Sequence, residues 1–247
     1  MRAKTEWTLQ SGVIVFGLLL SGLAMAAPPT EAETVAQRIA EYMVRARAVI
    51  ANNQSLFNNS GKADKGFSAA VYEVEIADGF NRMTGMDVTK LTDNGRVSAT
   101  ILKLHQSAKE IVTEAQPQIN TPGQGFKSFS PAIFGKRTLD RFGEKTGLKA
   151  KQTSIKNRNP ANKPDEFERQ MLEKFATGWR KQQPYTEATV VDGKKVVRHM
   201  LPLYITATCL PCHGDPAGER DISGNIKEGY KEGELRGAIS VIVPFDK

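Results

Sequence analysis

The sequence predicts an α+β fold, in which helices of the N-terminal half pack on an antiparallel sheet from the C-terminal half. Up to about residue 115, apolar residues recur every three to four positions, the spacing of one helix face. Beyond residue 148 they gather in short runs, two of which flank an Asp-Gly pair typical of a tight hairpin. The 247 residues are 40% hydrophobic and 25% charged, an ordinary globular composition that excludes disordered and fibrous classes.

Three helices are expected in the N-terminal half. Thr30 and Glu33 have the spacing of a capping box, so the first helix is expected to begin after Thr30. The second is expected to end near Gly85, and the third covers about 97–115. The apolar positions that predict the three helices are Val35, Ile39, Met43, Ala46 and Ile50, then Phe67, Val71, Val74 and Phe80, then Val97, Ile101, Leu104, Ala108 and Ile111.

A short helix opens the C-terminal half. Ser130 followed by Pro131 gives a cap and a first-turn proline, and Gly147 ends the pattern. A strand is expected over 148–155, then a polar loop, then a helix over 165–176.

The remaining elements are strands. Segments 186–191 and 194–207 flank Asp192-Gly193 and predict a hairpin, and 237–244 is a continuous apolar run typical of a buried strand. We therefore divide the chain into an N-terminal helical segment, 27–120, and a mixed α+β domain, 121–247.

The first 26 residues have the pattern of a secretory signal peptide. Arg2 and Lys4 precede a short apolar run, and Ala24-Met25-Ala26 forms a small-x-small cleavage site before Ala27. The run is shorter than the roughly 20 residues that span a bilayer, so cleavage is expected rather than anchoring. The mature chain is expected in the periplasm, without a stable membrane span.

Both cysteines of the chain fall in one five-residue window, Cys209-Leu210-Pro211-Cys212-His213. CxxCH is the attachment pattern of haem c. Two thiols three residues apart can form thioethers with the two vinyl groups of one haem, and the next residue is then held under the iron. The sequence predicts one covalent haem, with Cys209 and Cys212 as thioether residues and His213 as proximal iron ligand.

Three alternatives compete for the CxxC pair. A thioredoxin-like redox pair would stand at a helix start after the first strand of a βαβ unit, whereas this pair follows a hairpin near the C-terminus. A structural disulfide and a zinc site remain. Zinc is disfavoured because adjacent Cys212 and His213 cannot readily bind the same tetrahedral ion and no second ligand pair exists.

The sixth iron ligand is open. His199 or Met200, adjacent on the strand before CxxCH, is one possibility, and an iron without a strong second ligand is another. Other candidates are His105, Met43, Met83, Met86 and Met171, although methionine at helical spacing usually fills a core.

Positive charge is concentrated in one segment, Lys136 to Lys163, which carries nine basic residues and two acidic ones. The segment is either an ordinary solvated face or a surface for haem propionates and an acidic partner protein. Arg158 is the best candidate for a propionate contact because its planar fork suits a carboxylate. An exported chain is not expected to bind nucleic acid.

Longer stretches of the chain resemble a known family. Three segments are similar to exported, single-haem c domains of PAS-like fold. They are Gln152 to Glu168, with its core Arg158-Asn159-Pro160-Ala161-Asn162-Lys163-Pro164-Asp165, then Pro202-Leu203-Tyr204, and the CxxCH-Gly segment. The resemblance covers about residues 124–246 and, more loosely, the N-terminal helices. It implies a PAS-like sheet, thioether roles for Cys209 and Cys212, a proximal role for His213, and a redox- or gas-sensing function.

The chain departs from this family at one point. A member of the family uses an upstream cysteine as the second axial ligand, but this chain has no third cysteine. The segment Phe129 to Gly135, which we align there, offers no strong iron ligand. The resemblance therefore leaves either a site for an exogenous ligand or a substituted His or Met.

Three functions follow as hypotheses. The first is a periplasmic haem c protein that senses redox state or a small ligand such as NO or CO and signals through a partner protein. The second is a periplasmic electron carrier that uses the basic segment as its docking face. An enzyme of the haem peroxidase type ranks last because no distal His–Arg pair can be recognised, so we do not expect an enzyme.

Overall fold

The computed structural model describes residues 28–179 and 182–245. The predicted signal peptide therefore lies outside the described residues. The helices are α1 (Glu31–Asn52), α2 (Gln54–Phe57), α3 (Ala69–Thr84), α4 (Arg96–Ile119), α5 (Pro131–Thr146), α6 (Glu166–Ala176) and α7 (Leu210–His213). The strands are β1 (Lys149–Thr153), β2 (Tyr185–Val191), β3 (Lys194–Tyr204) and β4 (Leu235–Pro244), and three 3-10 turns are η1 (Val88–Lys90), η2 (Pro160–Asn162) and η3 (Ala207–Cys209).

The predicted helix boundaries are confirmed where the sequence carries caps. Thr30 and Glu33 form the capping box of α1, and Ser130 caps α5 with Pro131 in its first turn. Gly85 and Gly147 end α3 and α5 in the left-handed conformation, at φ of 73° and 70°.

The four strands form one antiparallel sheet in the order β1-β4-β3-β2. Asp192 and Gly193 both have positive φ, as a two-residue hairpin between β2 and β3 requires. At the other edge, Gly237 lies so close to β1 that an added Cβ would be 2.3 Å from the Thr153 carbonyl oxygen. The α+β class is thus confirmed, whereas the PAS-like character of the sheet stays a prediction.

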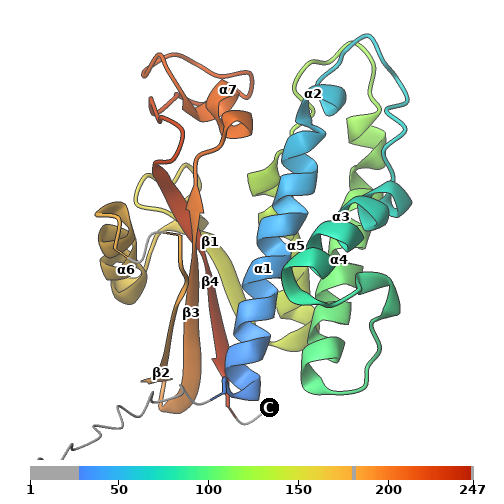
Figure 1. Cartoon of the computed structure of the whole chain (residues 1–247). Coiled ribbons are helices and arrows are strands. Elements are labelled where there is room, and N and C mark those ends of the chain that lie inside the picture. Colours follow the sequence, from blue (N-terminus) through green and yellow to red (C-terminus); the bar gives the residue numbers. More distant parts are fainter. Residues whose placement is uncertain (1–27, 180–181, 246–247) are drawn as a thin grey trace, which may run out of the picture.

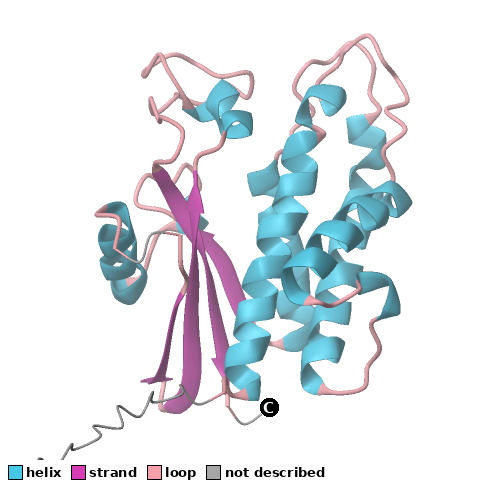
Figure 2. Ribbon diagram, in the orientation of Figure 1, coloured by secondary structure: helices cyan, strands magenta, loops and turns pink. Residues whose placement is uncertain are grey.

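Helices cover both faces of the sheet (Figures 1 and 2). On one face, α1 contacts β3 and β4 and also contacts α3, α4 and α5. On the other face, α6 packs on β3 and β4 through Met171, Leu172 and Phe175. None of the helices in the described ranges is long and apolar enough to cross a membrane.

A hydrophobic core runs through the α1 side of the molecule. It includes Ile39 of α1 and Leu104 of α4 as well as Phe142 of α5 and Val241 of β4. Residues on both sides of the predicted boundary at 120 therefore share one core. The boundary itself stays a prediction.

Candidate functional site

The CxxCH segment lies in a lobe formed by residues 205–234, the connection between β3 and β4. Figure 1 shows this lobe beyond the ends of those strands. Two backbone hydrogen bonds close its base: the Ile205 amide donates to the Glu234 carbonyl at 2.8 Å, and the Gly233 amide donates to the Ile205 carbonyl at 2.9 Å. The CxxCH residues occupy η3 and α7, two consecutive turns of helix.

The two thiols are free and partly buried. Cys209 Sγ lies 3.4 Å from the hydroxyl of Thr206. Burial raises the pKa of the Cys212 thiol, and the nearby Asp221 carboxylate raises it further. The two cysteines stand on consecutive helical turns, and within the described ranges no group of three or more His, Cys, Asp or Glu side chains could hold an ion.

His213 is fixed by its backbone and by one ring nitrogen. Its carbonyl accepts a 2.8 Å hydrogen bond from the Tyr230 amide, and its Nδ1 lies 2.8 Å from Oε2 of Glu228. Burial lowers the pKa of His213, and the Arg236 charge lowers it as well, against the opposing effect of Glu228. A neutral ring that donates through Nδ1 keeps Nε2 unprotonated and available to a metal.

Glu228 is in turn held by Arg158, which comes from the loop between β1 and α6. Arg158 Nε donates to Oε1 of Glu228 at 2.7 Å, and Nη2 donates to Oε2 at 2.9 Å. Nη1 donates to the buried Asp221 carboxylate at 2.7 Å. Burial alone would raise the pKa of Glu228, but the hydrogen bonds and charges of Arg158 and His213 hold it below its ordinary value.

Arg158 also binds the backbone of the lobe. Its Nη2 lies within 2.8 Å of the Cys212 carbonyl oxygen and 2.9 Å of the Ile226 carbonyl oxygen. The structure thus brings Arg158 to the CxxCH segment, as expected, but all three guanidinium nitrogens already have acceptors in the protein. A propionate contact of Arg158, which stays a prediction, would have to displace one of them.

A second arginine near the site, Arg47, has one nitrogen without a partner. Arg47 extends from α1 toward Gly135, and its buried Nε has no hydrogen-bond partner among the described residues. Burial lowers the pKa of Arg47 to about 10; a thiolate at Cys209 would raise this pKa, and the Arg236 charge lowers it. A buried N–H without an acceptor is costly, so an anionic group beside Cys209 would find an unpaired donor in this Nε.

The other predicted iron ligands do not meet His213. His199 lies in the middle of β3, where its Nδ1 is 2.7 Å from the Thr186 hydroxyl. Met200, on the opposite face, packs under α6. Tyr204, at the end of β3, is five positions beyond His199, roughly 17 Å at the usual rise. This placement argues against either residue as sixth ligand.

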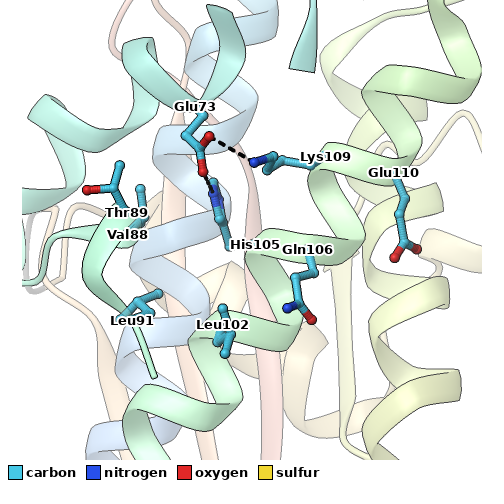
Figure 3. Close-up of a pocket in the computed structure, with 9 residues that line it drawn as sticks. All are labelled: Glu73, Val88, Thr89, Leu91, Leu102, His105, Gln106, Lys109 and Glu110. Carbon is cyan, nitrogen blue, oxygen red and sulfur yellow. Dashed lines mark hydrogen bonds and ion pairs between the residues drawn. The ribbon is translucent and has the colours of Figure 1, made fainter. Parts of the chain in front are cut away.

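Both ring nitrogens of His105 form hydrogen bonds in a polar cluster between the helices (Figure 3). Its Nδ1 lies 2.9 Å from the Tyr42 hydroxyl and its Nε2 lies 3.0 Å from Glu73 Oε1. Glu73 also accepts a 2.8 Å hydrogen bond from Lys109, at the floor of an open pocket of about 360 Å³ between α3, η1 and α4. Since both ring nitrogens are engaged, His105 has no lone pair for an iron.

The methionine candidates also fill ordinary positions. Met43 is buried in the main core, Met171 is buried between α6 and the sheet, Met86 packs at the edge of the core, and Met83 is 46% exposed. In the segment aligned with the family's axial cysteine, Phe129 and Phe134 are fully buried, with ring centroids 6.0 Å apart. This segment therefore serves the core and offers no iron ligand.

The basic segment 136–163 is largely neutralised by acids of other elements. On α5, Arg137, Arg141 and Lys145 pair with Glu110 and Glu114 of α4. Further along, Lys151 pairs with Glu168, and Arg158 pairs with Glu228 and Asp221. The docking role of this segment stays a prediction.

Fold and site define a class: an α+β protein that presents two free thiols and one carboxylate-bound imidazole on a helical turn beyond its sheet. The donor set of the CxxCH segment fits covalent haem, and the unpaired Nε of Arg47 fits an acidic group of the same cofactor.

The chain belongs to the Tll0287-like family, whose model matches residues 26–244. This confirms the family resemblance drawn from the Arg158-Asn159-Pro160 motif and CxxCH. Among solved structures, the crystal structure of the cyanobacterial haem protein Tll0287 is 22% identical, with a TM-score of 0.41, covering 61% of this chain and 94% of that one. No curated protein matches.

Sequence reasoning found Cys209, Cys212, His213 and Arg158 but missed Glu228, Asp221 and Arg47. Glu228 lies 15 residues beyond His213 in a stretch rich in Gly and Lys, with no motif around it. The signal that could have found it is the arginine of the family motif, because a buried arginine needs carboxylate partners.

Proposed function

We propose that the mature chain binds one haem covalently and acts in the periplasm. The observation that carries the proposal is the pair of consecutive turns η3 and α7, which presents both free thiols beside an imidazole whose Nδ1 is already occupied. Membership of the Tll0287-like family supports it, since the protein Tll0287 is described as a haem protein.

The residues that would hold the group have separate tasks. Cys209 and Cys212 would each form a thioether, His213 Nε2 would bind the iron, and Arg47 would donate to an acidic side group. Bound haem supplies an iron that changes oxidation state or binds a small ligand.

Attachment is tested with cysteine variants made in a host that matures c-type haem. After denaturing electrophoresis, the wild-type chain should retain haem, Cys209→Ala and Cys212→Ala should each retain less, and the double variant should retain none. Retention by the double variant, or loss of all haem by the denatured wild type, would contradict covalent attachment.

Beyond haem binding, we propose a sensor of redox state or of a small ligand such as NO or CO, which acts through a periplasmic partner and not as an enzyme. The placement of His199, Met200 and His105 supports this, because none of these candidates comes within reach of His213. The alternative, an electron carrier, has less support because several side chains of its proposed docking face pair with acids of other elements.

The visible spectrum of the reduced protein, with and without CO, separates the two. A sensor with an accessible iron should show a high-spin ferrous spectrum that changes on adding CO. A low-spin spectrum that CO leaves unchanged would favour the carrier.

A further inference from the structure

The imidazole of His213 contacts a carboxylate rather than a neutral acceptor. Glu228 Oε2 lies 2.8 Å from His213 Nδ1, and the Glu228 side chain is 14% exposed. Such a hydrogen bond is short enough, and sheltered enough from water, to act on the electron density of the ring.

The carboxylate cannot turn away from the ring. Arg158 binds both of its oxygens, and Arg236 Nη2 lies 3.9 Å from Oε1. Arg158 also donates to the carbonyl oxygen of Cys212, so the same side chain fixes Glu228 and the backbone that carries His213. Orientation and charge at Nδ1 are therefore built into the lobe before any cofactor is attached.

An N–H donated to a carboxylate makes the other ring nitrogen a stronger electron donor. A stronger donor favours the more oxidised state of a metal bound to Nε2, and it lowers the reduction potential of that metal. Arg158 counteracts part of this effect because it shares Oε2 with His213 and withdraws charge from it.

We propose that Glu228 is the positioning residue that sets the reduction potential of the iron low by giving His213 imidazolate character, with Arg158 limiting the effect. The inference rests on the proposed haem attachment through His213. It adds to that function the part of the chain that tunes the site.

Glu228→Gln tests the proposal on the haem-loaded chain, because it keeps an acceptor of the same shape and removes the charge. Glu219→Gln is the matched control: it makes the same charge change in the same lobe, on a side chain that is 61% exposed and 3.8 Å from Lys227. By potentiometric titration, Glu228→Gln should shift the equilibrium toward the reduced form on the order of tenfold, about 59 mV for one electron. The control should shift it by much less.

Equal shifts in the two variants, or none in either, would overturn the proposal. Should Glu228→Gln fail to fold or load haem, the iron–histidine stretching frequency of the ferrous wild type decides. A frequency above that of a neutral imidazole–haem complex supports imidazolate character, and one equal to it contradicts the proposal. Absence of covalent haem in the wild type would instead contradict the proposed function, which keeps the two failures distinct.

Discussion

Arg158 connects three stretches of chain: the loop after β1, the CxxCH segment, and residues 221–228 of the same lobe. Its partners are two carboxylates and two backbone carbonyls, and its side chain is 22% exposed. Removing it leaves the buried Asp221 carboxylate without its cation and leaves Glu228 with only the more distant Arg236, and removing one partner of a buried ion pair is costly.

We therefore expect Arg158→Ala to lower the free energy of unfolding by about 3 kcal/mol. Arg158→Lys should recover only part of this, because one ammonium cannot replace a bidentate fork. Denaturant titration measures both. Arg137→Ala is the control, since its exposed pair with Glu114 should contribute less than about 1 kcal/mol; a similar loss in Arg137→Ala and Arg158→Ala would contradict the bracing role.

His199 gives the fold a pH dependence. Burial lowers its pKa to about 4, whereas an unfolded histidine titrates near 6.5. Below about pH 6.5, His199 becomes protonated in the unfolded chain but stays neutral in the folded chain. Its contribution to the free energy of unfolding is therefore fully present above that pH and decreases as the pH falls toward 4. At pH 5 the loss should be about 2 kcal/mol.

The measurement compares unfolding of the wild type and His199→Gln at about pH 7 and pH 5. The variant should lose less stability between the two by about 2 kcal/mol. An identical pH-dependent loss in both proteins would show that His199 is not responsible.

For single residues, the sequence predicts the role of a side chain that belongs to a motif. It does not predict the burial of a side chain when that burial depends on distant parts of the chain. His199 and Met200 alternate along β3, so a sheet with one covered face would bury only one of them. Both are buried because α6 covers the second face. Nothing in the local pattern of β3 reports that a distant helix will pack there.

Among the elements, α6 depends most on its N-terminus. Asp165 caps the helix by accepting from the Glu168 amide at 2.8 Å, and Glu168 completes the capping box. The other oxygen of Asp165 pairs with Arg198 of β3 at 2.5 Å, and the Arg198 guanidinium stands over the Phe167 ring at 4.1 Å. One residue thus starts the helix and attaches it to the sheet.

Asp165→Ala should lower the free energy of unfolding by about 2 kcal/mol, roughly 1 for the cap and the rest for Arg198, which loses its closest acceptor. Ser130→Ala is the comparison, because the Ser130 hydroxyl caps α5 by accepting from the Ile133 amide at 3.4 Å and, being uncharged, forms no ion pair. Denaturant midpoints should show the larger loss for Asp165→Ala; equal losses would mean that the Arg198 pair contributes nothing.

Helix boundaries can be predicted from the sequence where capping residues and glycines mark them, as at Thr30, Ser130 and Gly147. The buried face of α3 could not be predicted in this way. The predicted stripe includes Val74, which is 73% exposed, whereas Tyr72, Ile76 and Phe80 are buried. Tyr72 faces inward because its hydroxyl lies 3.0 Å from that of Tyr42, a tertiary contact that helical spacing cannot reveal.

For the whole molecule, the shared core predicts cooperative unfolding. The core residues Ile39 and Leu104 precede residue 120, and Phe142 and Val241 follow it. Since α1 contacts both the other helices and the sheet, neither part can open without exposing apolar surface of the other.

One transition is therefore expected, and two probes can check it. Far-UV circular dichroism follows the helices, and the fluorescence of Trp179, beside Phe175 and Tyr185, follows the α6 side of the sheet. The other tryptophan, Trp7, lies in the predicted signal peptide. Coincident denaturation curves are expected; separate transitions would instead support independent domains divided at residue 120.

At this scale, the periodicity predicts the α+β class, but the order β1-β4-β3-β2 and the position of α1 against the sheet depend on contacts between distant residues. The same holds for the site. CxxCH predicts the attachment turn, whereas the carboxylate behind His213 comes from the far side of the lobe.

The mass of the denatured, intact protein tests the central claim most directly. When it is produced in a host that matures c-type haem, the chain should have the mass of residues 27–247 plus one haem. The added mass of the haem should be absent when Cys209 and Cys212 are both replaced by alanine. A wild-type mass equal to that of the polypeptide alone would contradict the account.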